Sequence, residues 1–193
     1  MRFAILPVVL ALCFCTPALM AQGDHVEIGV FADYFNLNRT TPNINFVGLG
    51  ARAGFNVRPT VQIEAEMSYD FERNFTSVFS DGINTQFVRS HVRPINGFFG
   101  PKFMTSGGPF RAFGTFKVGF VSFSTSNESV PSGFVGGLGG ITEGNSRLAI
   151  YPGLGVEGFW GPFGLRLDGG DEIYFDGGAR NNLKVSFGPV VRF

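Results

Sequence analysis

The chain has 193 residues with 15 basic and 15 acidic side chains, so its formal net charge is zero and no polyanionic partner such as a nucleic acid is indicated. It is rich in Phe (24) and Gly (28), and 44% of its residues are hydrophobic. Because glycine is a poor helix former and is scattered through most of the alternating segments, the composition argues against helices and predicts strands and turns.

The first 21 residues are expected to be a cleaved secretory signal, leaving residues 22–193 as the mature domain. Arg2 precedes an apolar run that is too short to span a membrane as a helix, and small residues follow it. Cleavage is expected after Ala21, with Ala18 as the alternative. Both cysteines of the chain lie inside this segment, so the mature domain has no thiol and no disulfide.

Eight segments alternate between apolar and polar residues and are expected to be strands. The clearest is 60–72, where Val61, Ile63 and Ala65 begin one face while glutamates lie on the other. In chain order the eight segments are 25–36, 45–57, 60–72, 86–103, 110–122, 146–158, 163–174 and 183–193. Each has about the length that a tilted membrane strand needs.

The fourth segment changes phase partway along. Val88 and Val92 suggest one outward face, whereas Phe99 and Phe103 have the opposite parity. A β-bulge near Pro94 is therefore predicted, because a bulge shifts the alternation by one residue and tolerates a residue that has no N–H to donate.

The connections between these segments alternate between long and short. Residues 73–85 and 124–145 form the two longest, and tight turns are formed by Arg58–Pro59 before the first of them and by 160–162 after the second. This pattern is typical of an all-β, transmembrane, antiparallel up-and-down β-barrel, here of about eight strands, with its longer loops at one end.

Glycine indicates which face of this barrel points outward. The polar faces carry Gly29, Gly48, Gly50, Gly54, Gly153 and Gly155. Glycine is a poor residue for a solvent-facing strand but suits a crowded, curved lumen. The apolar face is therefore expected to face lipid.

The final segment, with the sequence VSFGPVVRF at 185–193, resembles the last strand of the small outer-membrane β-barrel family typified by the OmpA transmembrane domain and OmpX. The resemblance implies that Phe187, Val191 and Phe193 form the signal by which the barrel assembly machinery recognises the chain. It also implies residence among the lipids of the outer membrane of a Gram-negative-type bacterium.

Charged residues on the polar faces are expected to pair across the lumen, because charges in a narrow lumen must be paired or hydrated. The predicted ion network consists of Glu27, Arg52, Glu64, Glu66, Arg111, Lys117, Glu157, Arg166 and Lys184, and the same faces carry Asp33, Asp70, Asp168, Arg89 and Lys102. Acids and bases nearly cancel, so side chains are expected to fill the lumen of an eight-stranded barrel.

Catalytic motifs are weak in this sequence. Ser90 and His91 are adjacent and would point to opposite faces of a strand, and Glu64 with Glu66 fits an ion network better than a glycosidase pair. No cofactor or metal is expected. The sequence thus indicates a structural or surface-interaction role through the loops near 73–85 and 124–145. Two alternatives remain, a small porin-like channel and a lipid-modifying enzyme.

Overall fold

The computed structural model describes residues 25–38, 43–80, 85–105, 108–127, 135–136 and 146–193. The predicted signal segment lies outside these residues. The described strands are β1 (Val26–Leu37), β2 (Ile44–Arg58), β3 (Val61–Asp70), β4 (Arg73–Ser80), β5 (Thr85–Met104), β6 (Phe110–Asn127), β7 (Val135–Gly136), β8 (Ser146–Trp160), β9 (Phe163–Phe175) and β10 (Ala179–Arg192). Within these ranges no helix is long and apolar enough to cross a membrane.

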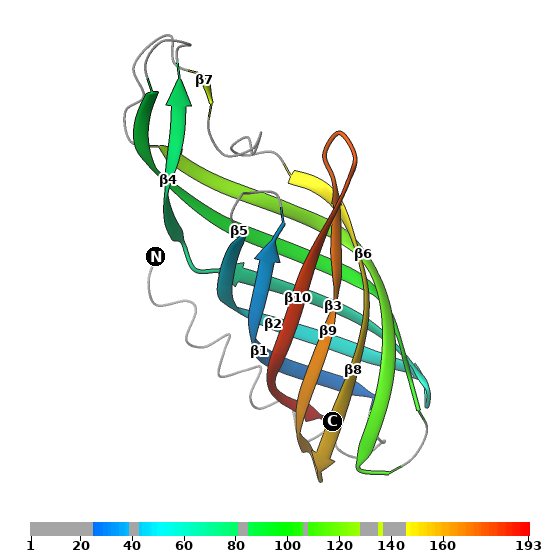
Figure 1. The fold of residues 1–193 in the computed structure, drawn as a ribbon. Coiled ribbons are helices and arrows are strands. Elements are labelled where there is room, and N and C mark those ends of the chain that lie inside the picture. The colour runs from blue at the N-terminus through cyan, green and yellow to red at the C-terminus, as the bar shows by residue number, and fades with distance from the viewer. Residues whose placement is uncertain (1–24, 39–42, 81–84, 106–107, 128–134, 137–145) are drawn as a thin grey trace, which may run out of the picture.

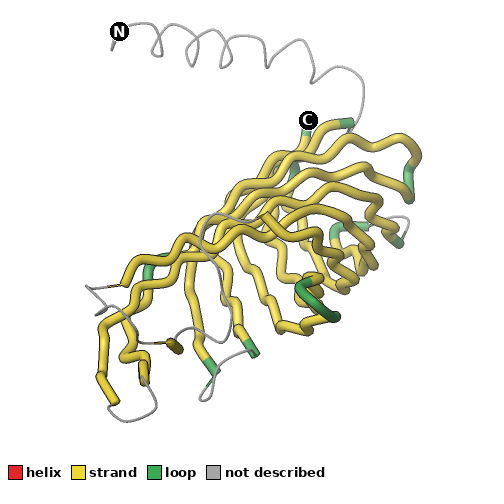
Figure 2. The backbone as a smooth tube through the Cα atoms, turned by 90° about the horizontal axis from the view of Figure 1, so that it is seen from above, coloured by secondary structure: helices red, strands yellow, loops and turns green. Residues whose placement is uncertain are grey.

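Eight of the strands close into an antiparallel barrel (Figures 1 and 2). Seven ladders join β3, β2, β1, β10, β9, β8, β6 and β5 in that order, and pairing between β3 and β5 closes the ring. All of the ladders are antiparallel, and consecutive barrel strands are neighbours throughout. The fold predicted from the sequence is therefore confirmed.

The barrel is apolar outside and charged inside. Large apolar side chains on the outer face are about half exposed; they include Ile28, Val30, Leu49, Phe55, Met67, Phe99, Phe116, Leu154, Leu167 and Phe187. Acidic and basic side chains of the opposite parity are buried. A water-soluble barrel would have the reverse arrangement, so the outer surface matches a lipid environment.

The region predicted as the long loop 73–85 is largely strand, which corrects the sequence-based prediction. β4 pairs with Thr85–Val92 of β5, and β6 continues to Asn127 alongside it. The two-residue β7 then pairs with the end of β4, so the predicted loop 124–145 also contains strand residues. These strands extend beyond the barrel rim (Figure 1). We call β4, β7 and the adjoining ends of β5 and β6 the extension.

A bulge is present at the level of Pro94 along the barrel axis, as predicted, but it lies on the strand opposite β5 and not in β5 itself. Pairing within β5 keeps one register against β6 from Ser90 to Met104, so the alternation there is unbroken. The shift lies on the neighbouring strand, because Tyr69 pairs with Ile95 whereas Arg73 pairs with Val92. The three residues between Tyr69 and Arg73 thus oppose two residues of β5, one of which is Pro94. As a result Val92 points into the barrel, contrary to the prediction.

Both ends of the described chain meet at the short-turn end of the barrel. The Phe193 N–H donates to the carbonyl of Val26 at 2.8 Å, and the Phe193 carbonyl accepts from the His25 N–H at 2.7 Å. These bonds complete the ladder between β1 and β10. The backbone of the last residue therefore belongs to the barrel seam.

Candidate functional site in the barrel lumen

Ten ionisable side chains fill the half of the lumen nearer the short turns, and we call them the balanced cluster. The acids are Glu27, Glu64, Glu66, Glu157 and Asp168, and the bases are Arg52, Lys102, Arg111, Lys117 and Arg166. All are buried except Arg111, which is partly exposed. Equal numbers of opposite charges make this part of the lumen neutral.

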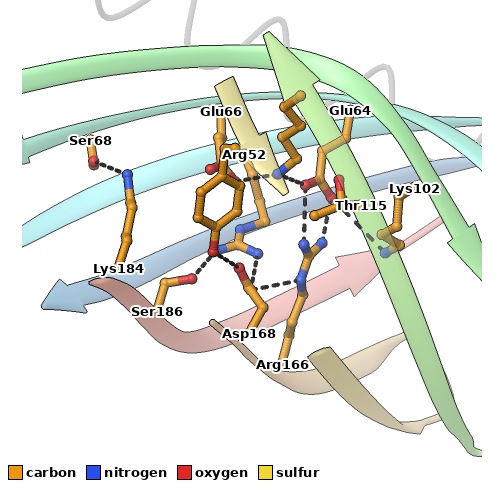
Figure 3. Close-up of polar contacts among 12 residues, drawn as sticks. Arg52, Glu64, Glu66, Ser68, Lys102, Thr115, Arg166, Asp168, Lys184 and Ser186 are labelled. Carbon is orange, nitrogen blue, oxygen red and sulfur yellow. Dashed lines mark hydrogen bonds and ion pairs between the residues drawn. The ribbon is translucent and has the colours of Figure 1, made fainter. Parts of the chain in front are cut away.

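Arg166 on β9 lies at the centre of the balanced cluster (Figure 3). Its guanidinium donates two hydrogen bonds to Glu64, one of them at 3.1 Å from Nη2, and a third from Nε to Asp168 at 3.0 Å. Arg52 reaches the same Asp168 oxygen at 2.6 Å. The bidentate geometry and the shared carboxylate tie three strands together across the lumen.

Two buried lysines each bridge a pair of carboxylates. Lys117 Nζ lies 2.5 Å from Glu64 and 2.6 Å from Glu66. Lys102 Nζ lies 2.7 Å from Glu157 and 3.1 Å from Glu27. The two glutamates that could be imagined as a glycosidase pair therefore share one ammonium group.

A second group of charges lies farther toward the long-loop end, and we call Asp33, Asp70, Glu172 and Lys184 the acidic chamber. Lys184 Nζ lies 3.6 Å from both Asp33 and Glu172, and it donates to Ser68 and Asn96 at 2.9 and 2.7 Å. Glu172 was not among the residues predicted to face the lumen. Arg166 and Asp168 of the same strand face inward at even positions, and the same alternation, extended past the two glycines that follow, identifies Glu172 as inward.

A layer of buried, mostly aromatic side chains lies in the lumen toward the long loops; it was not predicted, and we call it the aromatic layer. Its buried residues are Phe35, Leu37, Phe46, Val92, Phe98, Val121, Phe123, Ala149, Tyr151 and Tyr174. Most of them come from the loop-side halves of their strands, and they pack through ring contacts such as Phe123 against Tyr174, whose centroids are 5.5 Å apart. The lumen therefore contains an apolar layer in addition to its charges.

Aromatic rings also occupy the space beside inward glycines. A Cβ atom on Gly50 would overlap the ring of Phe31, and one on Gly155 would overlap the ring of Phe113. These glycines thus make room for inward rings.

The remaining predicted site residues are placed as follows. His91 lies on β5 at the base of the extension, where its Nδ1 is 3.0 Å from Glu72 and 2.6 Å from Asn74. The side chains of Ser90 and Arg89 lie outside the described residues. No group of three or more His, Cys, Asp or Glu in the described ranges is arranged to hold a metal ion.

The residues of the predicted assembly signal lie on β10 and directly after it. Phe187 is exposed on the outer face, whereas Val191 and Phe193 are half-buried. All three share the outward parity of β10. Their recognition by an assembly machinery stays a prediction.

A closed eight-stranded barrel with a lipid-facing exterior and a lumen of paired charges defines the class of small outer-membrane β-barrels. Solved structures with this fold include Ail of Yersinia pestis (12% identity over 88% of this chain and 97% of that one, TM-score 0.55). They also include Neisserial surface protein A (10%, 87% and 97%, TM-score 0.53) and OprG of Pseudomonas aeruginosa (11%, 89% and 96%, TM-score 0.54). No protein-family model and no curated protein sequence matches the chain.

Proposed function

We propose that the protein is an exported, non-catalytic barrel of the outer membrane with a filled lumen, serving envelope structure or contact with surface ligands. The observation that carries this proposal is the filling of the lumen by the balanced cluster, the acidic chamber and the aromatic layer. Paired charges and buried rings leave little room for a continuous aqueous path.

Ion conductance tests the filled lumen against the alternative of a small porin-like channel. Purified protein in a planar bilayer should give no steady conductance above that of the lipid alone. Phe31→Ala removes the ring beside Gly50 and serves as the comparison, since it should raise conductance if that ring blocks a path. A well-defined conductance from the unchanged protein would contradict the proposal and favour the channel.

The extension is the proposed site of surface interaction. It continues the sheet beyond the barrel rim, so its backbone stands clear of the surface that lipid would cover (Figure 1). The structure of Ail of Yersinia pestis has been determined in complex with the heparin analogue sucrose octasulfate, so a barrel of this fold can bind a ligand.

Location and orientation are tested by fractionation and proteolysis. The chain should enter the outer-membrane fraction after loss of its first 21 residues, with its final strand engaging the assembly machinery. Protease added to intact cells should cut at residues 128–145 and leave a protected barrel. Protection of that segment in intact cells, with cutting only after the envelope is opened, would contradict the orientation.

A further inference from the structure

The charge of the lumen is distributed unevenly along its axis. The balanced cluster has five acids and five bases, whereas the acidic chamber has three carboxylates, from Asp33, Asp70 and Glu172, and one ammonium group, from Lys184. All four side chains are buried. Two negative charges of the chamber thus have no counter-charge within it if every carboxylate is ionised.

Asp70 is the member with the fewest contacts. Neither of its carboxylate oxygens has a hydrogen-bond partner in the described part of the chain, and its side chain is fully buried. Both oxygens of Asp33 and both of Glu172 are likewise without a hydrogen bond, but each of these two carboxylates lies 3.6 Å from Lys184. A Cβ atom on Gly48 would lie 2.7 Å from Oδ1 of Asp33 and 2.7 Å from Oδ1 of Asp70, so both carboxylates pack over this glycine.

In the described part of the chain, the groups around the pair do not supply the missing positive charge. Lys184 from β10 divides its contacts among Asp33, Glu172, Ser68 and Asn96. The cations of the balanced cluster on β2 and β6 bind carboxylates of that cluster, as Arg52 does with Asp168 and Lys117 with Glu66. The other described neighbours, Glu66 on β3 and the aromatic layer, add no positive charge.

We propose that the acidic chamber is a proton-binding site in which Asp70, packed beside Asp33 over Gly48, retains a proton in the folded barrel. Two carboxylates packed over one glycine in a buried site cannot both ionise without strong repulsion, and a retained proton removes one charge and supplies a hydrogen-bond donor. A proton, unlike a larger ligand, also needs no cavity in which to bind. The inference concerns the interior of the barrel and does not depend on the proposed surface role.

The test compares the pH dependence of stability in the wild-type chain and in Asp70→Asn, each unfolded reversibly from lipid vesicles by urea. Above about pH 5 an unfolded aspartate has released its proton. If the folded chain retains one, its unfolding equilibrium constant should rise about tenfold per pH unit relative to that of Asp70→Asn, until the pair itself ionises. A ratio of the two constants that does not change with pH would overturn the proposal.

Asp168→Asn is the matched control, because Asp168 is a buried carboxylate with cationic partners at 2.6 and 3.0 Å. This variant should lose stability, but the ratio of its unfolding equilibrium constant to that of the wild type should not change with pH over the same range. An equal slope for both variants would overturn the assignment to the chamber. Infrared spectra of the folded proteins give a readout independent of unfolding: the carbonyl stretch of a protonated carboxyl should be present in the wild type and lost in Asp70→Asn. Its absence from the wild type would also overturn the proposal.

Discussion

Replacing Arg166 by Met should destabilise the barrel by about 3 kcal/mol, since breaking a buried pair by removing one partner typically costs about 3–5 kcal/mol. The lower end applies because none of its three carboxylate partners is left without a cation. Glu64 keeps Lys117 at 2.5 Å, Asp168 keeps Arg52 at 2.6 Å, and Glu27, which lies 3.7 Å from Arg166, keeps Lys102 at 3.1 Å. The change therefore removes the link among these carboxylates, together with the guanidinium that lies 4.2 Å from the centroid of Phe113.

Urea titration of folding into lipid vesicles measures this loss. Leu167→Met is the control, because Leu167 is the next residue along β9 and faces outward. It exchanges one apolar side chain for another and should cost less than about 1.5 kcal/mol. Adding Glu64→Met to Arg166→Met should restore part of the loss, since apolar replacement of both partners of a buried pair is often neutral. A loss under about 1 kcal/mol for Arg166→Met is typical of solvent-exposed pairs, so it would refute the burial of this cluster away from water.

Three further predictions address the lipid face, the terminal residue and the register. Ala65→Arg should cost about 2–4 kcal/mol in the same titration if the residue lies near the bilayer midplane, whereas Ala65→Leu should be tolerated; equal costs would contradict the outward assignment. Phe193→Ala retains the backbone bonds of the seam, so it should slow assembly in cells while leaving vesicle stability nearly unchanged; normal assembly would remove its proposed role. Deleting Glu72 takes out the extra residue of the bulge near Pro94 and should cost about 1 kcal/mol or less. Deleting Ile95 should instead abolish the heat-resistant folded barrel on gels, because every later residue of β5 would change faces. A folded product from the second deletion would contradict this register.

The alternation of the sequence is sufficient to predict the barrel because a side-chain period of two holds along nearly all of each strand. Ile28 and Val30 lie outward and Glu27 lies inward, as the pattern indicates. Lipid contact requires the outward residues to be apolar, so that face is read easily. Inward residues have no such common requirement, because a lumen can hold charged, polar or apolar side chains. Phe35 and Phe46 have the inward parity of their strands, but they are as apolar as outward residues, so the expectation of a charged lumen did not include them.

The extension was missed for a different reason. Residues 73–80 are rich in Asn, Ser and Thr, a composition typical of loops, and their hydrogen bonds are made to a strand that follows later in the chain. The bulge shows the same limit. The sequence of β5 shows that its pairing is interrupted near Pro94, but the extra residue belongs to the strand opposite, and only the register of the two strands together places it there.

Part of the high content of glycine and phenylalanine has a common cause in the lumen. The ring of Phe31 occupies the space beside Gly50, and the Arg52 guanidinium lies 4.1 Å from the centroid of that ring. Phe113 likewise lies beside Gly155, with the Arg166 guanidinium 4.2 Å from its centroid. A ring can approach a barrel wall this closely only where that wall carries no Cβ, and the ring then gives an arginine a face on which to stack. Each such stack fixes a cation at a definite height in the lumen, where its hydrogen bonds to carboxylates can form without the entropy cost of ordering a free side chain. Glycine in these strands is therefore part of what positions the charges.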